Sequence, residues 1–280
     1  NLAFSGTQLT KLELPDTVTG VSLSGLSGQL KYLRWTAGIP VIKSSQFAQW
    51  DVLETIILPE GVTAIQDGTN TGYGAFDNCD NLTTVSLPST LTQVGSYAFY
   101  KCASLEKITV PGSVERIGIY AFYDCNVLTD VTLNVGLKTI DRYAFSSCDA
   151  LEVLTLPEGL ATIGGYAFSN TQIAKLELPD TVTSLGTLGM SGSLTELRWT
   201  AGIPVVPSSV LSGYAKLETL ILPEGVTEIQ NGANTGYGAF DSCVNLTSVS
   251  LPSTLTYIIY VPKTCKYNDF DIFLLVSLLP

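Results

Sequence analysis

The chain of 280 residues contains no histidine and only one methionine, and few of its residues are charged. Without histidine it cannot form a Ser-His-Asp triad, a Cys-His pair, an HExxH zinc site or a His-ligated haem. A net charge of −11 argues against nucleic acid and anionic membranes as main partners, because both bind clustered Lys and Arg. We therefore expect no cofactor and no enzymatic activity. The many apolar residues can fill a large core, which excludes a disordered chain.

A repeat of 23 residues is the strongest feature that is present. Residues 98–120, 121–143 and 144–166 follow one another without a gap and share the pattern A-F-x-x-C-x-x-L-x-x-[LIV]-x-L-P-x-x-[LV]-x-x-[IV]-G-x-Y. Self-similarity at a fixed period of this length is typical of a solenoid, so it takes precedence over other local signals.

The same frame runs through most of the chain and predicts about eleven coils. In successive coils the residue that follows L-x-L is Pro15, Thr36, Pro59, Pro88, Pro111, Asn134, Pro157, Pro179, Thr200, Pro223 and Pro252. The spacings recur in order with an offset of 164 residues, and residues 33–41 and 197–205 are identical. A seven-coil cassette has therefore been duplicated, and its second copy stops after four coils.

These motifs resemble the BspA-like class of leucine-rich repeats, over roughly residues 1–258. The resemblance implies a leucine-rich repeat solenoid and a bacterial protein that is secreted or displayed on the cell surface. It also implies adhesion to host or microbial proteins, although one solenoid fold serves many unrelated partners.

Each coil has a physical interpretation that is independent of the resemblance. The alternating L-x-L segment predicts a short strand, and strands of successive coils would stack in parallel about 4.8 Å apart. The I-G segment predicts a second short extended stretch, and A-F-x-x-C a helical turn that packs its Phe inward. Because one coil cannot bury its own apolar face, neighbouring coils must cover it.

Two columns of equivalent residues are expected inside the solenoid. Eight phenylalanines share one repeat position: Phe4, Phe47, Phe76, Phe99, Phe122, Phe145, Phe168 and Phe240. Five cysteines share another: Cys79, Cys102, Cys125, Cys148 and Cys243. Stacked equivalents have parallel Cα–Cβ vectors at the coil spacing, which is too wide for a disulfide, so we expect buried free thiols. Cys265 lies outside the column and could be reactive or paired.

Two surfaces are candidates for binding. The first is the exposed face of the strands, with Glu13–Arg34 and Glu177–Arg198 as expected cross-strand ion pairs. Its candidate residues are Tyr32, Arg34, Ile57, Lys107, Glu196, Arg198 and Ile221. The second is a tyrosine column just before A-F, formed by Tyr97, Tyr120, Tyr143 and Tyr166. Both also have a purely structural interpretation, as a solvated sheet face and as stacked rings.

Two segments depart from the repeat. A six-residue insertion falls within Asp67–Tyr73 and recurs within 231–237, and the Asp, Asn and Gly residues there resemble a calcium loop. One copy lacks the Asp and no bidentate Glu follows, so a projecting turn is favoured and no metal is expected. Residues 259–280 form an irregular tail that could cap the last coil or be an unrelated fusion or reading-frame accident. Its apolar end is too short to span a membrane, so no membrane insertion is expected.

The sequence thus predicts a non-enzymatic protein, secreted or on the cell surface, that binds an extracellular or host protein. Two alternatives stay open: a glycan-binding module that uses the tyrosine column, and a structural spacer that displays another domain. An enzyme would have to use paired carboxylates, and Glu60, Glu158 and Glu224 fall in equivalent surface turns rather than in a cleft.

Overall fold

The computed structural model describes residues 4, 6–23, 25–68, 73–208, 210–230 and 239–258. Within these ranges the chain forms short strands joined by turns, with no helix. It divides into two compact units. The first comprises Asn1–Ile173 and Ser184–Met190, and the second Ala174–Thr183 and Ser191–Pro280.

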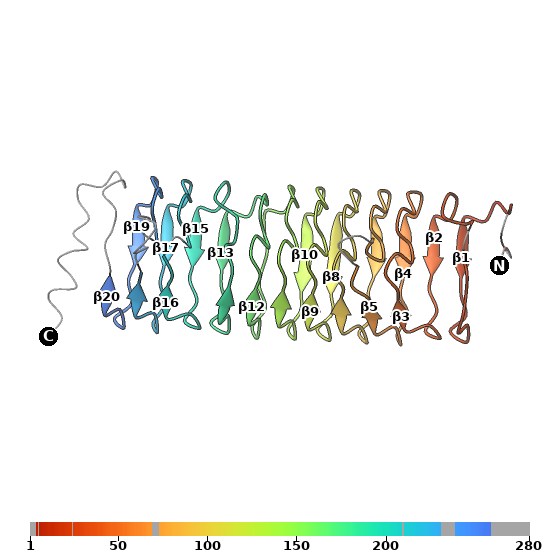
Figure 1. Ribbon diagram of the computed structural model, residues 1–280, viewed down its shortest axis with the longest axis horizontal. Helices are drawn as coiled ribbons and strands as arrows, with labels where there is room; N and C mark the ends of the chain where they lie inside the picture. Colours follow the sequence, from red (N-terminus) through yellow and green to blue (C-terminus); the bar gives the residue numbers. More distant parts are fainter. Residues whose placement is uncertain are drawn as a thin grey trace. The chain divides into compact units, whose positions relative to one another are not determined.

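The L-x-L segments form the first of two series of strands. In the first unit they are β1 (Lys11–Glu13), β2 (Tyr32–Arg34), β4 (Thr55–Ile57), β6 (Thr84–Ser86), β8 (Lys107–Val110) and β10 (Asp130–Leu133). In the second unit they are β13 (Lys175–Glu177), β15 (Glu196–Arg198), β17 (Thr219–Ile221) and β19 (Ser248–Ser250). They pair in parallel as β1-β2-β4-β6, β10-β8 and β13-β15-β17-β19, and equivalent repeat positions are in register (Figure 1).

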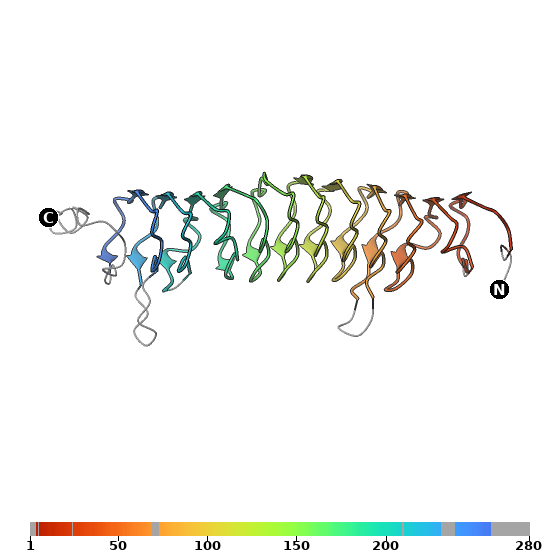
Figure 2. The same ribbon diagram turned by 90° about the horizontal axis from the view of Figure 1, so that it is seen from above.

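The I-G segments form the second series, as expected. In the first unit they are β3 (Val41–Ile42), β5 (Ala64–Ile65), β7 (Gln93–Val94), β9 (Arg116–Ile117), β11 (Thr139–Ile140), β12 (Thr162–Ile163) and β14 (Ser184–Leu185). In the second unit they are β16 (Val205–Val206), β18 (Glu228–Ile229) and β20 (Tyr257–Ile258). Figure 2 shows that the two series occupy different sides of the coils of the first unit. The predicted parallel-strand solenoid is therefore confirmed.

The number of complete coils is smaller than the eleven expected. Nine coils carry both strands among the described residues. The first coil has no second strand, and the seventh has no first strand, because residues 151–157 do not pair as a strand. The prediction of a strand at every L-x-L segment is thus wrong for the seventh coil.

The A-F-x-x-C segment is not the helical turn that the sequence predicts. Tyr97, which precedes it in one coil, and Lys101, which lies within it, both have φ near +60°, as do their equivalents Tyr120 and Asp124 in the next coil. The backbone N–H of Phe99 donates to the carbonyl of Ala121 in the following coil at 2.7 Å. Left-handed residues at intervals of four break helical geometry, so the segment is a run of tight turns bonded to its neighbour.

The phenylalanine column is the centre of the core, as predicted. The rings from Phe47 to Phe145 are fully buried, and each stacks on the next with centroids 5.0–5.3 Å apart. Buried thiols lie beside this column. Cys102 donates to the carbonyl oxygen of Phe76 in the preceding coil at 3.2 Å, and Cys125 to that of Phe99 at 3.2 Å. The five described cysteines are buried thiols, which confirms that prediction, whereas Cys265 lies outside the described residues.

Candidate functional site

The candidate residues of the strand face fall into three groups. In the first unit Arg34 is in register with Glu13 on one side and Ile57 on the other. In the second unit Arg198 occupies the equivalent place between Glu177 and Ile221. The structure thus brings Tyr32, Arg34 and Ile57 together, and separately Glu196, Arg198 and Ile221. Lys107 lies apart from both groups, in the two-stranded sheet of β8 and β10.

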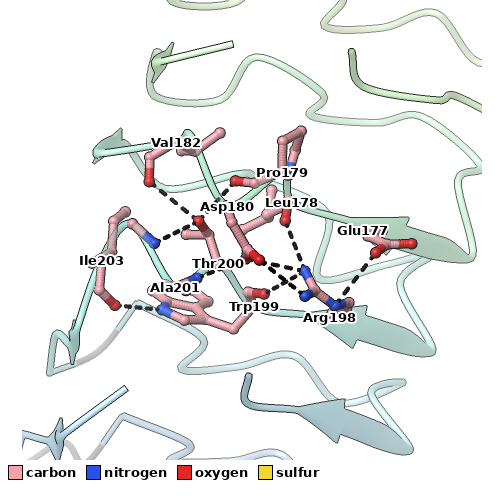
Figure 3. Close-up of polar contacts among 11 residues, drawn as sticks. Glu177, Leu178, Pro179, Asp180, Val182, Arg198, Trp199, Thr200, Ala201 and Ile203 are labelled. Carbon is pink, nitrogen blue, oxygen red and sulfur yellow. Dashed lines mark hydrogen bonds and ion pairs between the residues drawn. The ribbon is translucent and has the colours of Figure 1, made fainter. Parts of the chain in front are cut away.

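Arg198 is held by a dense set of polar contacts (Figure 3). Its Nη1 and Nη2 donate to Oδ1 and Oδ2 of Asp180, both at 3.3 Å, in a bidentate ion pair. Nη1 also lies 3.3 Å from the carbonyl oxygen of Leu178 and 3.4 Å from that of Trp199. Nε contacts Oε1 of Glu177 at 3.3 Å, which confirms the expected cross-strand pair. The guanidinium therefore connects β13 to β15 and to the turn after each strand.

The turn beyond Arg198 is fixed by the same group of residues (Figure 3). The backbone N–H of Ala201 donates to Oδ1 of Asp180 at 2.9 Å, and this bond and the Arg198 pair hold the pKa of the Asp180 carboxyl below its usual value. The buried indole N–H of Trp199 donates to the carbonyl oxygen of Ile203 at 3.1 Å. The identical R-W-T-A-G-I-P segment therefore serves to close a turn where the usual proline is replaced by threonine.

Arg34 in the first unit makes the same contacts with one exception. It forms a bidentate pair with Asp16 at 3.0 and 3.1 Å, and it donates to the carbonyl of Leu14 at 3.0 Å. The expected pair with Glu13 is absent from the described contacts. The carboxylate of Glu13 instead pairs with Lys11, two residues earlier on the same strand, at 2.9 Å. Sequence reasoning missed Asp16 and Asp180; the acid that precedes Thr in both L-P-D-T segments was the available signal.

The tyrosine column forms a ladder on the first unit. The ring of Tyr120 stacks on that of Tyr143 at 4.8 Å and on that of Tyr97 at 5.1 Å, and Tyr143 stacks on Tyr166 at 5.3 Å. All four residues are left-handed, with φ between 56° and 60°. A bulky residue in this region is strained by roughly 1 kcal/mol or more, and stacking across coils offsets part of that cost. We call these four residues the tyrosine ladder.

A second, shorter stack lies beside the ladder. Tyr100 stacks on Tyr123 at 5.1 Å, and Tyr123 meets Tyr120 edge-on at 5.3 Å. Burial is the main cause that raises the pKa of Tyr100 and of Tyr120, and neighbouring tyrosines add to it. Two cations cover the outside of these rings: Lys101 over Tyr100, and Arg142 over Tyr143.

The interior holds one unusual acid. Asp77 precedes Asn78 in the A-F-x-x-C segment of the fourth coil and is buried. Burial raises its pKa to about 6, although the amide of Asn78 donates to its carboxylate. Burial likewise raises the pKa of Cys79 and that of Cys125 to about 12, which makes these thiols poor nucleophiles at neutral pH.

The insertion is described only at its edges, because residues 69–72 and 231–238 lie outside the described residues. Oδ1 of Asp67, at its start, accepts a hydrogen bond from the backbone N–H of Ser96 at 2.6 Å and pairs with Arg116 at 3.0 Å. Arg116 also pairs with Asp141 at 2.7 Å. Within the described ranges no group of His, Cys, Asp and Glu is arranged to hold a metal ion, and no helix has the length and apolar character to span a membrane.

This geometry defines a class of protein: a parallel β-solenoid of leucine-rich repeats with aromatic and thiol columns in its core. A family model described as a BspA type leucine-rich repeat region matches residues 1–71, 69–193 and 188–260. The chain therefore belongs to the BspA-type leucine-rich repeat family, whose fold is one used for protein interaction. No curated protein matches the chain.

Solved structures of similar fold come from bacterial leucine-rich repeat proteins. One from Bacteroides ovatus is 22% identical, with a TM-score of 0.50 over 89% of this chain and 82% of that chain. The T. pallidum protein TpLRR is 22% identical, with a TM-score of 0.47 over 76% and 79% of the two chains. A leucine-rich cell surface protein from Faecalibacterium prausnitzii is 20% identical, with a TM-score of 0.38 over 94% and 82%. The first of these supports the assignment of the fold.

Proposed function

We propose that the chain is a non-enzymatic binding module of a secreted or surface-displayed bacterial protein, and that it mediates adhesion to an extracellular or host protein. The observation that carries this proposal is the ladder of partly exposed tyrosines, which repeats over four coils of a rigid scaffold. Tyrosine and arginine are the side chains that contribute most to protein interfaces, and rigid presentation lowers the entropic cost of binding.

The turn carboxylates support a non-enzymatic role. Oε1 and Oε2 of Glu60 accept hydrogen bonds from the backbone N–H and the hydroxyl of Ser89, both at 2.9 Å. Glu224 makes the same two bonds to Ser253 at 3.0 Å. These bonds lower the pKa of both carboxyls. Both side chains therefore help to hold the next coil in place. A general acid for hydrolysis would need the opposite shift.

Binding of the purified chain to immobilised extracellular-matrix proteins tests the proposal. We expect saturable binding to at least one of them, which the double substitution Tyr120→Ala with Tyr143→Ala weakens. Thermal unfolding of the variant distinguishes loss of the surface from loss of the fold. The proposal would be overturned, and a spacer favoured, if the chain bound no protein of the panel and the native protein were not secreted.

Glycan binding is the second candidate, because the hydroxyl edges of the stacked tyrosines offer a row of hydrogen-bonding groups at the coil spacing. A glycan array separates the two functions. Signal on neutral or acidic glycans that the double tyrosine variant loses, without binding to any matrix protein, would assign the ladder to carbohydrate.

A further inference from the structure

Arg142 differs from the other arginines of the described chain in having no carboxylate partner. Arg34 pairs with Asp16, Arg116 with Asp67 and Asp141, and Arg198 with Glu177 and Asp180. Arg142 is exposed, and its Nη2 instead donates to the hydroxyl oxygen of Tyr143 at 3.1 Å. The neighbouring Asp141 offers its carboxylate to Arg116 at 2.7 Å.

The guanidinium of Arg142 is nevertheless held in place. Its Cζ lies 4.8 Å from the ring centroid of Tyr143 and 6.0 Å from that of Tyr166. The two rings are stacked on each other with an angle of 10° between their planes, so the cation lies close to two members of one stack. A cation over aromatic faces keeps its charge and its remaining N–H donors available, while its side chain has already lost much of its freedom.

The surroundings of Arg142 are open and partly apolar. The equivalent position in the preceding coil is Ile119, which is 38% exposed, and Tyr166 is 40% exposed. The equivalent position in the following coil is Gly165, where an added Cβ would meet no atom within 4 Å. The cation is therefore flanked by an apolar side chain on one side and by open space on the other.

We propose that Arg142, with Tyr143, Tyr166 and Ile119, is the hot spot of the tyrosine ladder, and that its partner is a protein segment with an Asp or Glu carboxylate directed at the guanidinium. This rests on the proposed function and names the chemistry of its partner. Arginine binds carboxylates through a planar fork of donors, and no carboxylate among the described residues pairs with Arg142.

Two observations favour a protein segment over a charged polymer or a sugar. Arg142 is a single unpaired guanidinium on a chain of net charge −11, so one local carboxylate suits it better than a polyanion does. The inner ladder rings cover each other, since Tyr120 and Tyr143 lie 4.8 Å apart at an angle of 7°, and their faces are closed to a sugar ring.

Selection of random linear peptides displayed on phage against the immobilised chain tests the proposal. The same library is selected against Arg142→Gln, Arg142→Lys and Lys43→Gln. Lys43 is the matched control, because it is exposed, carries the same charge and belongs to neither candidate surface. Circular dichroism establishes that all four proteins have the same fold.

We expect peptides selected on the wild type to be enriched in Asp or Glu, and their affinity to fall about fivefold on Arg142→Gln, the upper end of what an exposed charge pair contributes. Arg142→Lys should retain part of the affinity, and Lys43→Gln should leave it unchanged. Peptides whose affinity does not change on Arg142→Gln would overturn the hot spot but leave the proposed function in place. If none of the four proteins yields binding peptides, the proposed function itself fails. A glycan-array signal that Arg142→Gln abolishes, without acidic peptides, would replace the protein partner with a carbohydrate.

Discussion

Single residues in this solenoid are governed by the contacts between adjacent coils. Arg198 illustrates this, because its sequence neighbours predict only a strand-face cation, whereas its guanidinium bonds to Asp180 and to two carbonyl groups. The side chains of Arg198 and Asp180 are 29% and 50% exposed. Such a residue stabilises the junction of two coils.

A double-mutant cycle tests the role of Arg198. Arg198→Gln and Asp180→Asn should each lower the free energy of unfolding by about 1 kcal/mol, and the double variant should lose less than the sum, with a coupling of about 0.5–1 kcal/mol. Arg198→Lys should not restore stability, because an ammonium cannot make the bidentate pair. Denaturant melts measure all four proteins, and a coupling of zero would show that the pair is not formed.

The buried carboxyl of Asp77 should make stability fall as pH rises. Its pKa is about 6 in the folded chain and 3.8 is its ordinary value, so the folded state binds more protons between these values. The stability conferred by the protonated form is complete below about pH 4 and is lost by about pH 6. At pH 7, Asp77→Asn should therefore raise the free energy of unfolding by about 2 kcal/mol, measured as unfolding at a higher denaturant concentration. At pH 4 the substitution should change the free energy of unfolding little.

The exposed Glu152→Gln is the control for Asp77→Asn, because it removes the same charge from a surface position. Equal stabilisation by both substitutions at pH 7 would mean that relief of the net charge, rather than burial of Asp77, is the cause.

At the scale of elements, the repeat pattern predicts more of the strands than of the turns. Alternation places Leu33 and Leu197 inward and their neighbours outward, as found, because a strand has only two faces. The turns differ from prediction since Tyr, Lys and Ser give no local signal for a left-handed backbone. Hydrogen bonds to the next coil and ring stacking select that conformation, and neither is visible in a single repeat.

The seventh coil offers a test at this scale. The backbone N–H and C=O groups of Glu152–Leu156 have no hydrogen-bond partner among the described residues, whereas the equivalent β8 segment pairs with β10. Hydrogen exchange should therefore be faster by at least about tenfold for the amides of residues 152–156 than for those of β8. Equal protection in the two segments would show that the seventh coil forms the strand that its sequence predicts.

At the scale of the whole molecule, stability should be local, because each coil of a solenoid contacts only its neighbours. The cysteine column gives a built-in probe, since each thiol is buried and donates to a carbonyl group of the preceding coil. Each thiol should therefore react only after its own coil opens. Phe122→Ala removes a fully buried ring from the centre of the first unit, at a cost of about 3–5 kcal/mol. Labelling of Cys125 and Cys148 should then occur at a lower denaturant concentration.

Cys243 belongs to the second compact unit, and its labelling should be almost unchanged by Phe122→Ala. Mass spectrometry of thiol-labelled peptides reads each cysteine separately, and Phe240→Ala is the matched variant that should reverse the pattern. If either substitution shifts the labelling of all five cysteines equally, the two units unfold as one cooperative body. The duplicated cassette would then act as a single folding unit, despite a repeat architecture in which strands pair only with those of adjacent coils.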